Sequence, residues 1–154
     1  MTPAMTTSDL NAFLERDYPE LNAGGRAYEV SAVGPGTVEV TLRADATHIR
    51  PGATVSGPVL MTLTDIACWL VILAHIGPAA LTVTTHLSID FLRKPAPGLL
   101  VGRARLLKLG KRLAVSACEI GGADPAEPFT AATATYSIPP VAVSKAHEAR
   151  ILSI

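Results

Sequence analysis

Residues 47–76 have the sequence THIRPGATVSGPVLMTLTDIACWLVILAHI. A Pro-Gly pair near its start indicates a loop, and Ser56 stands where the N-cap of a helix is expected. Pro58 suits the first helical turn, because its missing N–H would have had no intrahelical partner there. The residues that follow are almost all apolar, and Gly77 with Pro78 ends the run. We therefore predict one long apolar helix over residues 59–76, enclosed by the core of the protein.

One acidic side chain interrupts this helix, at Asp65. A buried carboxylate is costly unless it is paired, hydrogen-bonded or protonated. Two interpretations follow: Asp65 is bonded within the fold or faces solvent, or it faces a cleft as a nucleophile or general base. Met61 and Trp69 flank Asp65 at helical spacing, which indicates core packing or the lining of an acyl pocket.

The apolar helix is also about long enough to span a membrane, for which ~20 residues are needed. The charge of Asp65 near its middle argues against that, so we expect no membrane contact. The whole chain has 154 residues, a length that favours one domain over residues 1–154. Of these residues 49% are hydrophobic and only 17% are charged, which favours burial of surface between subunits. Thirteen basic and thirteen acidic side chains balance, so charge does not suggest a nucleic-acid partner.

Two cysteines, Cys68 and Cys118, have no zinc-like spacing and form no disulfide framework. Both lie in apolar surroundings and are typical of small core residues in a reducing cytoplasm. Residues 1–9 are polar and do not resemble a signal peptide. We therefore expect a cytoplasmic protein without a metal site or a cofactor.

Alternating patterns predict strands around the apolar helix. A short amphipathic helix over residues 8–16 comes first. Six strands are then expected, at 28–33, 38–44, 81–92, 99–108, 113–120 and 129–138, with a tail at 139–154 that forms a short helix or is loose. Short turns between strands indicate antiparallel pairing. The prediction is an α+β domain with a core over about 28–138, in which a curved antiparallel sheet of about six strands wraps around one long buried helix.

The strand at 81–92 has the clearest alternation. Leu81, Val83, Leu87, Ile89 and Phe91 fall on one face, where Thr85 breaks the apolar pattern. A hydroxyl bonded within the core is the simplest explanation, because threonine is a good strand former.

The order of elements, the segment TVSGPVLMTLTDIA and the strand TTHLSIDFLRKP together resemble a hotdog-fold thioesterase of the PaaI-like, phenylacetate-pathway branch. That family has an asparagine, a glycine, then His-Gly-Gly and, eight residues after the first glycine of that pair, an aspartate. Gly52, Gly57 and Asp65 match this pattern in type and spacing. Three positions depart from it, because Arg50 replaces the asparagine, Ser56 the histidine and Pro58 the second glycine.

The resemblance implies hydrolysis of an acyl-CoA thioester to the free acid and coenzyme A. The Gly57 N–H would stabilise the oxyanion, Asp65 would attack the carbonyl or activate water, and Thr85 would orient that water. Arg50 would replace the family asparagine, pair with Asp65, or bind an anionic substrate group. The remaining substrate-binding and CoA-binding candidates are Ser56, Met61, Trp69, Lys111 and Arg112. The family's pocket lies between subunits, so a homodimer or a homotetramer is expected.

Two alternatives remain open at this stage. The departures at Arg50, Ser56 and Pro58 favour a non-catalytic hotdog protein that binds acyl-CoA without hydrolysing it. A CoA-ester hydratase of the same fold would need an Asp/His pair, and no histidine stands near Asp65 in the sequence.

Overall fold

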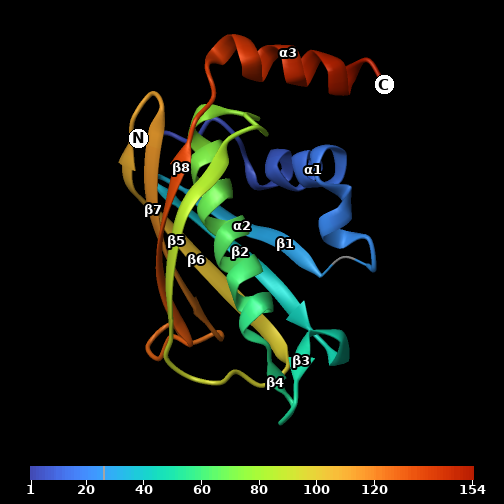
Figure 1. Ribbon diagram of the computed structural model, residues 1–154, viewed down its shortest axis with the longest axis vertical. Helices are drawn as coiled ribbons and strands as arrows, with labels where there is room; N and C mark the ends of the chain where they lie inside the picture. The colour runs from blue at the N-terminus through green and yellow to red at the C-terminus, as the bar shows by residue number, and fades with distance from the viewer. Residues whose placement is uncertain (26) are drawn as a thin grey trace.

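A six-stranded antiparallel sheet curves around helix α2 (Gly57–Ile76) in the computed structural model, which describes residues 1–25 and 27–154 (Figure 1). The strands are β1 (Tyr28–Gly34), β2 (Thr37–Ala44), β5 (Val83–Phe91), β6 (Gly98–Leu109), β7 (Leu113–Gly121) and β8 (Thr130–Ser137), in the spatial order β1-β2-β6-β7-β8-β5. All neighbouring strands pair antiparallel. This confirms the predicted α+β sheet-and-helix architecture.

Helix α2 begins two residues before the predicted start and ends where predicted. Ser56 is its N-cap in extended conformation, and Gly77, with φ of 96°, ends it. Eleven of its side chains are buried, which explains why the helix is apolar on nearly all sides. It is the only helix of the described chain long and apolar enough to cross a membrane, but 61% of its apolar window is buried inside the protein. Helix α2 is therefore the core helix of a soluble domain.

The contact between α2 and β6 depends on Gly102. A Cβ atom at this position would lie 3.2 Å from Cγ of Leu63 and 3.5 Å from Cβ of Ala67. The absence of a side chain here lets the helix approach the middle of the sheet closely.

Helix α1 (Thr7–Asp17) covers part of the side of α2 that faces away from the sheet (Figure 1). Its N-cap is Thr6, which forms a capping box with Asp9, so the helix begins one residue before the predicted start at residue 8. Phe13 of α1 packs its ring 5.5 Å from that of Trp69 on α2. This contact fixes the end of α1 next to the middle of α2.

The remaining elements are η1 (Pro19–Asn22), η2 (Ala46–His48), the hairpin β3 (Ile49–Arg50) with β4 (Thr54–Val55), and α3 (Val141–Leu152). The hairpin lies at one end of the molecule and α3 at the other, while η1 follows α1 at the side (Figure 1). Helix α3 forms in the C-terminal tail, where a short helix was one of two expectations, and none of its residues is buried.

Strand β5 departs from strict alternation at Thr85. Thr84 pairs with Tyr136 and His86 with Thr135, so Thr85 is the extra residue of a β-bulge. Before the bulge, Thr82 is buried and Val83 is 52% exposed, the reverse of the predicted faces. The predicted faces were wrong in this half of the strand. The extra residue at the bulge reverses the alternation, so the residues before it and the residues after it cannot follow one continuous pattern.

Candidate active site

The candidate catalytic carboxylate lies on the side of α2 that is turned away from β6 and towards β5 and β8. Pro58, Met61 and Thr62 are exposed along it, and Asp65 follows one turn later and is half-buried. Trp69 comes next and is covered by α1. Helical spacing therefore places Asp65 where the strip passes from solvent into the interior.

Two hydroxyl groups hold the Asp65 carboxylate in place. Thr84 donates a hydrogen bond of 2.7 Å to Oδ1, and the Tyr136 hydroxyl lies 2.6 Å from the same oxygen. The Tyr136 hydroxyl also lies 2.9 Å from the Asp65 carbonyl oxygen. Among the described residues both donors contact Oδ1, which leaves Oδ2 free to contact a substrate or a water. A carboxylate fixed on one oxygen and free on the other is suited to act as nucleophile or base.

Tyr136 can serve only as a donor to this carboxylate over the ordinary pH range. Burial raises the pKa of Tyr136 well above its ordinary value, and the negative charge of Asp65 raises it further. The phenol therefore stays protonated and keeps its hydrogen bond to Asp65.

Thr85, which the family resemblance implied as the residue that orients water, does not contact Asp65 of the same chain. Its side chain is exposed, and its hydroxyl donates to the Thr135 carbonyl at 3.2 Å. Thr84, one residue earlier, contacts Asp65 instead. Thr85 broke the alternating pattern because it is the extra residue of the bulge. The bulge turns the side chain of Thr84 towards Asp65.

Gly57 lies at the N-terminus of α2, where backbone N–H groups have no intrahelical partner. The ring of Phe91 lies beside it, because a Cβ at Gly57 would be 3.6 Å from Phe91 Cε1. Eight residues separate Gly57 from Asp65, which corresponds to about 12 Å along the helix.

Arg50 and Ser56 lie in the segment that leads into α2. Arg50 is exposed in the β3–β4 hairpin, and it forms no hydrogen bond or ion pair with a side chain of residues 1–25 or 27–154. The expected alternative of an Arg50–Asp65 pair is therefore not formed within one chain. The Ser56 backbone N–H donates to the His48 carbonyl at 2.9 Å, while its side chain makes no capping hydrogen bond.

A cavity of about 350 Å³ adjoins Asp65. Trp69 and Ile66 line it from α2, Thr82 and Thr84 from the start of β5, and Asp17 and Tyr18 close it at the end of α1. Met61 lies outside this cavity and is 42% exposed. The structure thus brings together Asp65, Trp69 and Thr84, of which sequence reasoning had missed Thr84.

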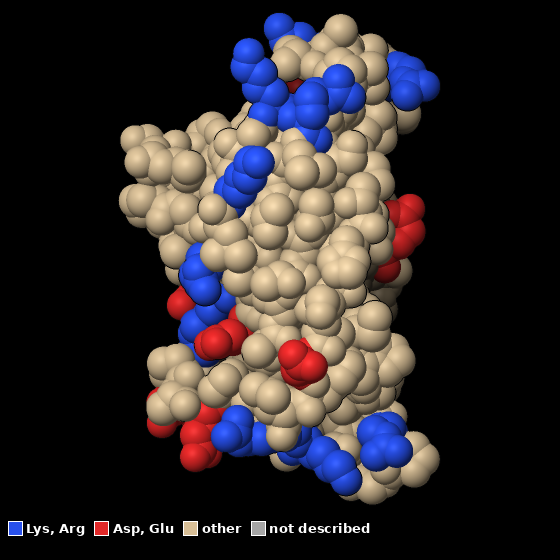
Figure 2. Space-filling model, turned by 60° about the vertical axis from the view of Figure 1, so that its left-hand side comes forward, with Lys and Arg blue, Asp and Glu red and all other residues tan. Residues whose placement is uncertain are grey.

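Lys111 and Arg112 line a separate cavity of about 1010 Å³. It lies between the C-terminal end of α2, the turn from β6 to β7, and α3, which contributes Lys145. The Arg112 Nε donates to the Ile138 carbonyl at 2.9 Å. Figure 2 shows Lys and Arg side chains gathered at the end of the molecule that carries α3.

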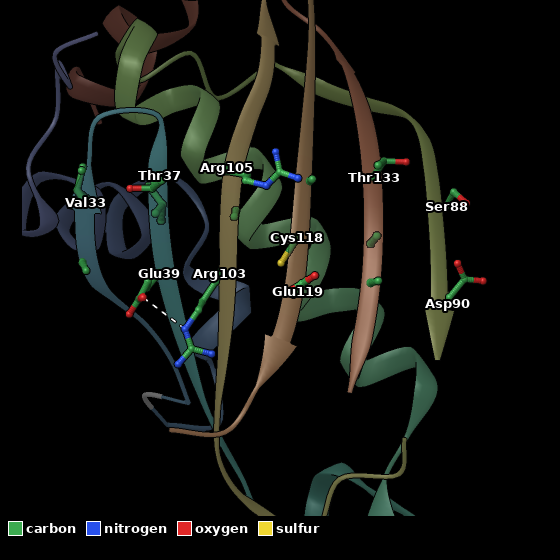
Figure 3. A pocket seen from close by; sticks show the side chains of 17 residues that line it. Val33, Thr37, Glu39, Ser88, Asp90, Arg103, Arg105, Cys118, Glu119 and Thr133 are labelled. Atoms are coloured by element: carbon green, nitrogen blue, oxygen red, sulfur yellow. Dashed lines mark ion pairs between the residues drawn. The ribbon is translucent and has the colours of Figure 1, made fainter. Parts of the chain in front are cut away.

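A third hollow, of about 720 Å³, lies on the outer face of the sheet (Figure 3). The side chains labelled there come from β1, β2, β5, β6, β7 and β8, and an ion pair joins Glu39 and Arg103 at 3.4 Å. The sheet separates this hollow from α2 and Asp65, so it is not a candidate for the catalytic centre. No group of three or more His, Cys, Asp or Glu residues within 1–25 and 27–154 is arranged to hold a metal ion.

The sequence pattern of the thioesterase superfamily matches residues 52–128, half of the chain. A solved structure of a proposed thioesterase from a Silicibacter species is 39% identical over 91% of this chain and 96% of its own, with a TM-score of 0.81. The chain belongs to the thioesterase superfamily and has its hotdog fold, as the sequence predicted.

Further similarity extends to the phenylacetate branch. A proposed thioesterase from Ralstonia eutropha, described as phenylacetic acid degradation-related, is 26% identical over 87% of this chain and all of its own, with a TM-score of 0.73. A hypothetical thioesterase from Streptococcus pneumoniae, solved with coenzyme A, shares the fold at 23% identity, covering 73% and 85% of the two chains, with a TM-score of 0.64. The match to a curated relative, a proposed esterase of Thermoplasma acidophilum, is 24% identical over 56% of this chain and spans 65% of that relative.

The raised pKa of Tyr136 predicts how stability depends on pH. The folded protein holds this proton more tightly than the unfolded chain, so the stabilising contribution is complete below pH ~10 and is lost as the pH rises above it. We expect the free energy of unfolding in urea to fall above pH 10, by up to ~1.4 kcal/mol per pH unit from this group. Tyr136→Phe removes that part of the slope. Tyr18→Phe is the control, because Tyr18 is 37% exposed, and an unchanged slope in Tyr136→Phe would contradict the assignment.

Proposed function

We propose that the protein is an acyl-CoA thioesterase that hydrolyses its substrate to a free acid and coenzyme A. The proposal rests on one observation, the Asp65 carboxylate held on Oδ1 by Thr84 and Tyr136 beside a cavity. Membership of the thioesterase superfamily supports the reaction class, and the S. pneumoniae relative solved with coenzyme A supports the carrier.

The chemistry adds the oxygen of a water molecule to the acyl carbon and breaks the carbon–sulfur bond. Asp65 Oδ2 either attacks the carbonyl, forming an anhydride that water then hydrolyses, or removes a proton from an attacking water. The Gly57 N–H, at the positive end of α2, stabilises the negative charge on the carbonyl oxygen. The sulfur of coenzyme A leaves as the thiolate, which is a good leaving group at neutral pH. Thr84 and Tyr136 keep Asp65 oriented through these steps.

The first test is the hydrolysis of a panel of acyl-CoA esters, followed by release of free thiol. We expect Asp65→Asn to lower kcat by about 10²-fold or more, because the variant keeps the side-chain shape but loses the base or nucleophile. Thr84→Val is expected to lower kcat less, since it removes only one of the two orienting hydrogen bonds.

The same experiment separates the alternative function. A non-catalytic acyl-CoA-binding protein, which the departures at Arg50, Ser56 and Pro58 favour, would bind the esters and release no thiol. Turnover that survives in folded Asp65→Asn would instead overturn the assignment of Asp65.

Two chains are needed to complete the proposed site. The oxyanion donor must lie about 3 Å from the carbonyl oxygen, and the nucleophile about 3–3.5 Å from the carbonyl carbon. Gly57 and Asp65 of one chain are about 12 Å apart along α2, so they cannot both reach the same carbonyl. We infer that Asp65 of one subunit acts together with Gly57 of a second subunit, across a two-fold axis.

Strand β5 provides the surface for such a dimer. It lies at the edge of the sheet and pairs only with β8, so its other edge has unpaired backbone groups. Val83 and Phe91 on this strand, and Leu92 after it, are each at least half exposed. The face on this side of the molecule carries few charged side chains between its two ends (Figure 2). A homotetramer would require a further contact, for which the outer face of the sheet (Figure 3) is the candidate.

Mixed dimers test the two-chain site. Gly57→Pro removes the N–H donor, and Ser56, with φ of −72° and ψ of 151°, already has the conformation that a residue before proline adopts. Each of Asp65→Asn and Gly57→Pro alone should lose ~10²-fold or more of the activity. A purified heterodimer of the two variants has one intact site of two, so we expect about half the native activity. A heterodimer no more active than its parents would contradict a shared site.

Lys111 and Arg112, with Lys145, are proposed to bind the phosphates of coenzyme A in the cavity beside α3. Hydrogen bonds to charged groups contribute about 1.5–3 kcal/mol each, so we expect Lys111→Ala to raise KM for acyl-CoA about tenfold or more. The KM for an N-acetylcysteamine thioester, which lacks the phosphates, should not change. Arg105→Ala, in the hollow on the outer face of the sheet, is the control. An equal change in KM for both substrates would contradict a role in phosphate binding.

A further inference from the structure

Three residues that line the cavity beside Asp65 each carry a buried polar atom without a partner. Asp17 Oδ2, Trp69 Nε1 and Thr82 Oγ1 make no hydrogen bond to any described residue, and all three residues line this one cavity. Buried polar atoms are almost always hydrogen-bonded in folded proteins, because leaving one unpaired is costly. Three such atoms, on residues that line one cavity, indicate that this region is built for a polar group that the protein itself does not supply.

Asp17 is the least expected of the three residues. Its side chain is only 2% exposed and lines the cavity, and Oδ1 accepts a hydrogen bond from Arg16 Nε, which leaves Oδ2 without a partner among the described residues. Packing holds the end of α1 in this position, because Tyr18 places its ring edge against Trp69, with centroids 6.3 Å apart. The carboxylate is therefore fixed in the cavity wall.

The types of the three atoms define the group that they can bind. An indole N–H only donates, an ionised carboxylate only accepts, and a threonine hydroxyl does both. A hydroxyl group matches this set, since it donates to Asp17 Oδ2 and accepts from Trp69 Nε1 or Thr82 Oγ1. A carboxylate would be repelled by Asp17, an ammonium would leave the Trp69 N–H unpaired, and a methyl group would leave all three atoms unpaired.

We propose that Asp17, Trp69 and Thr82 form a specificity pocket for a hydroxyl group on the acyl chain. This inference rests on the proposed function, because it assigns the cavity beside Asp65 to the acyl part of the thioester. The volume of about 350 Å³ lies at the lower end of the range for small-molecule sites, which suits a short acyl group. A pocket built to hydrogen-bond a hydroxyl discriminates strongly against the analogue that lacks it, because its own polar atoms then stay unpaired.

The test compares matched pairs of acyl-CoA esters with chains of three to six carbons, with and without one terminal hydroxyl. We expect the native protein to favour the hydroxylated member of at least one pair by tenfold or more in kcat/KM. Asp17→Asn, Trp69→Phe and Thr82→Val, which change shape little, should each lower this ratio. Thr133→Val is the matched control for Thr82→Val, because Thr133 lies on the outer face of the sheet.

Two results would overturn the proposal: a native preference for the unsubstituted ester in every pair, or a preference that persists in all three variants. Binding of the same pairs to Asp65→Asn, measured by calorimetry, separates this inference from the proposed function. If no ester is hydrolysed but the hydroxylated esters bind more tightly, and Asp17→Asn removes that difference, the pocket stands and the reaction does not. Equal binding of both members of every pair would overturn the pocket even where hydrolysis is observed.

Discussion

The fold depends on enclosing a twenty-residue helix that is apolar on almost every side. Such a helix cannot stay in water, and a flat sheet would cover only one of its faces. The curved sheet solves most of this problem, and α1 covers a further part through the contact between Phe13 and Trp69. What remains uncovered is the strip from Pro58 to Asp65. The candidate active site is thus the part of the core helix that the chain leaves open.

The carboxylate in that strip is compatible with its surroundings because of partners distant in the sequence. Thr84 comes from one edge strand and Tyr136 from its neighbour, and both bond the same oxygen of Asp65. Of the two interpretations left open at first, bonding within the fold is confirmed for Oδ1. Asp65 also lines a cavity, and its role as nucleophile or base stays a prediction. A buried polar network of this kind specifies one arrangement of helix and sheet, because other packings would leave its members unpaired.

Most of the fold was predictable from the sequence, and the site only in part. Helices and strands follow from local features of the sequence, namely the apolar run, the alternating patterns and the Gly and Pro residues that end elements. For this reason α2 and the six sheet strands lie within two residues of their expected bounds. The partners of Asp65 depend on strand pairing over 19 and 71 residues of sequence, which alternation does not reveal. Strict alternation allows no bulge, so it drew attention to Thr85 and gave no indication that Thr84 contacts Asp65. Nothing in the sequence indicated that Asp17 is buried, because its burial results from how α1 packs on α2.

The bulge in β5 divides this strand into two segments with opposite phase. In the first segment the even-numbered residues face the helix and supply Thr82 and Thr84 to the cavity. In the second segment the odd-numbered residues Leu87 and Ile89 are the partly covered ones. The lining of the cavity and the packing of the core are therefore encoded on separate stretches of this part of the chain. Mutation can vary the first stretch while the second is conserved, so a new substrate preference could evolve here without redesigning the sheet.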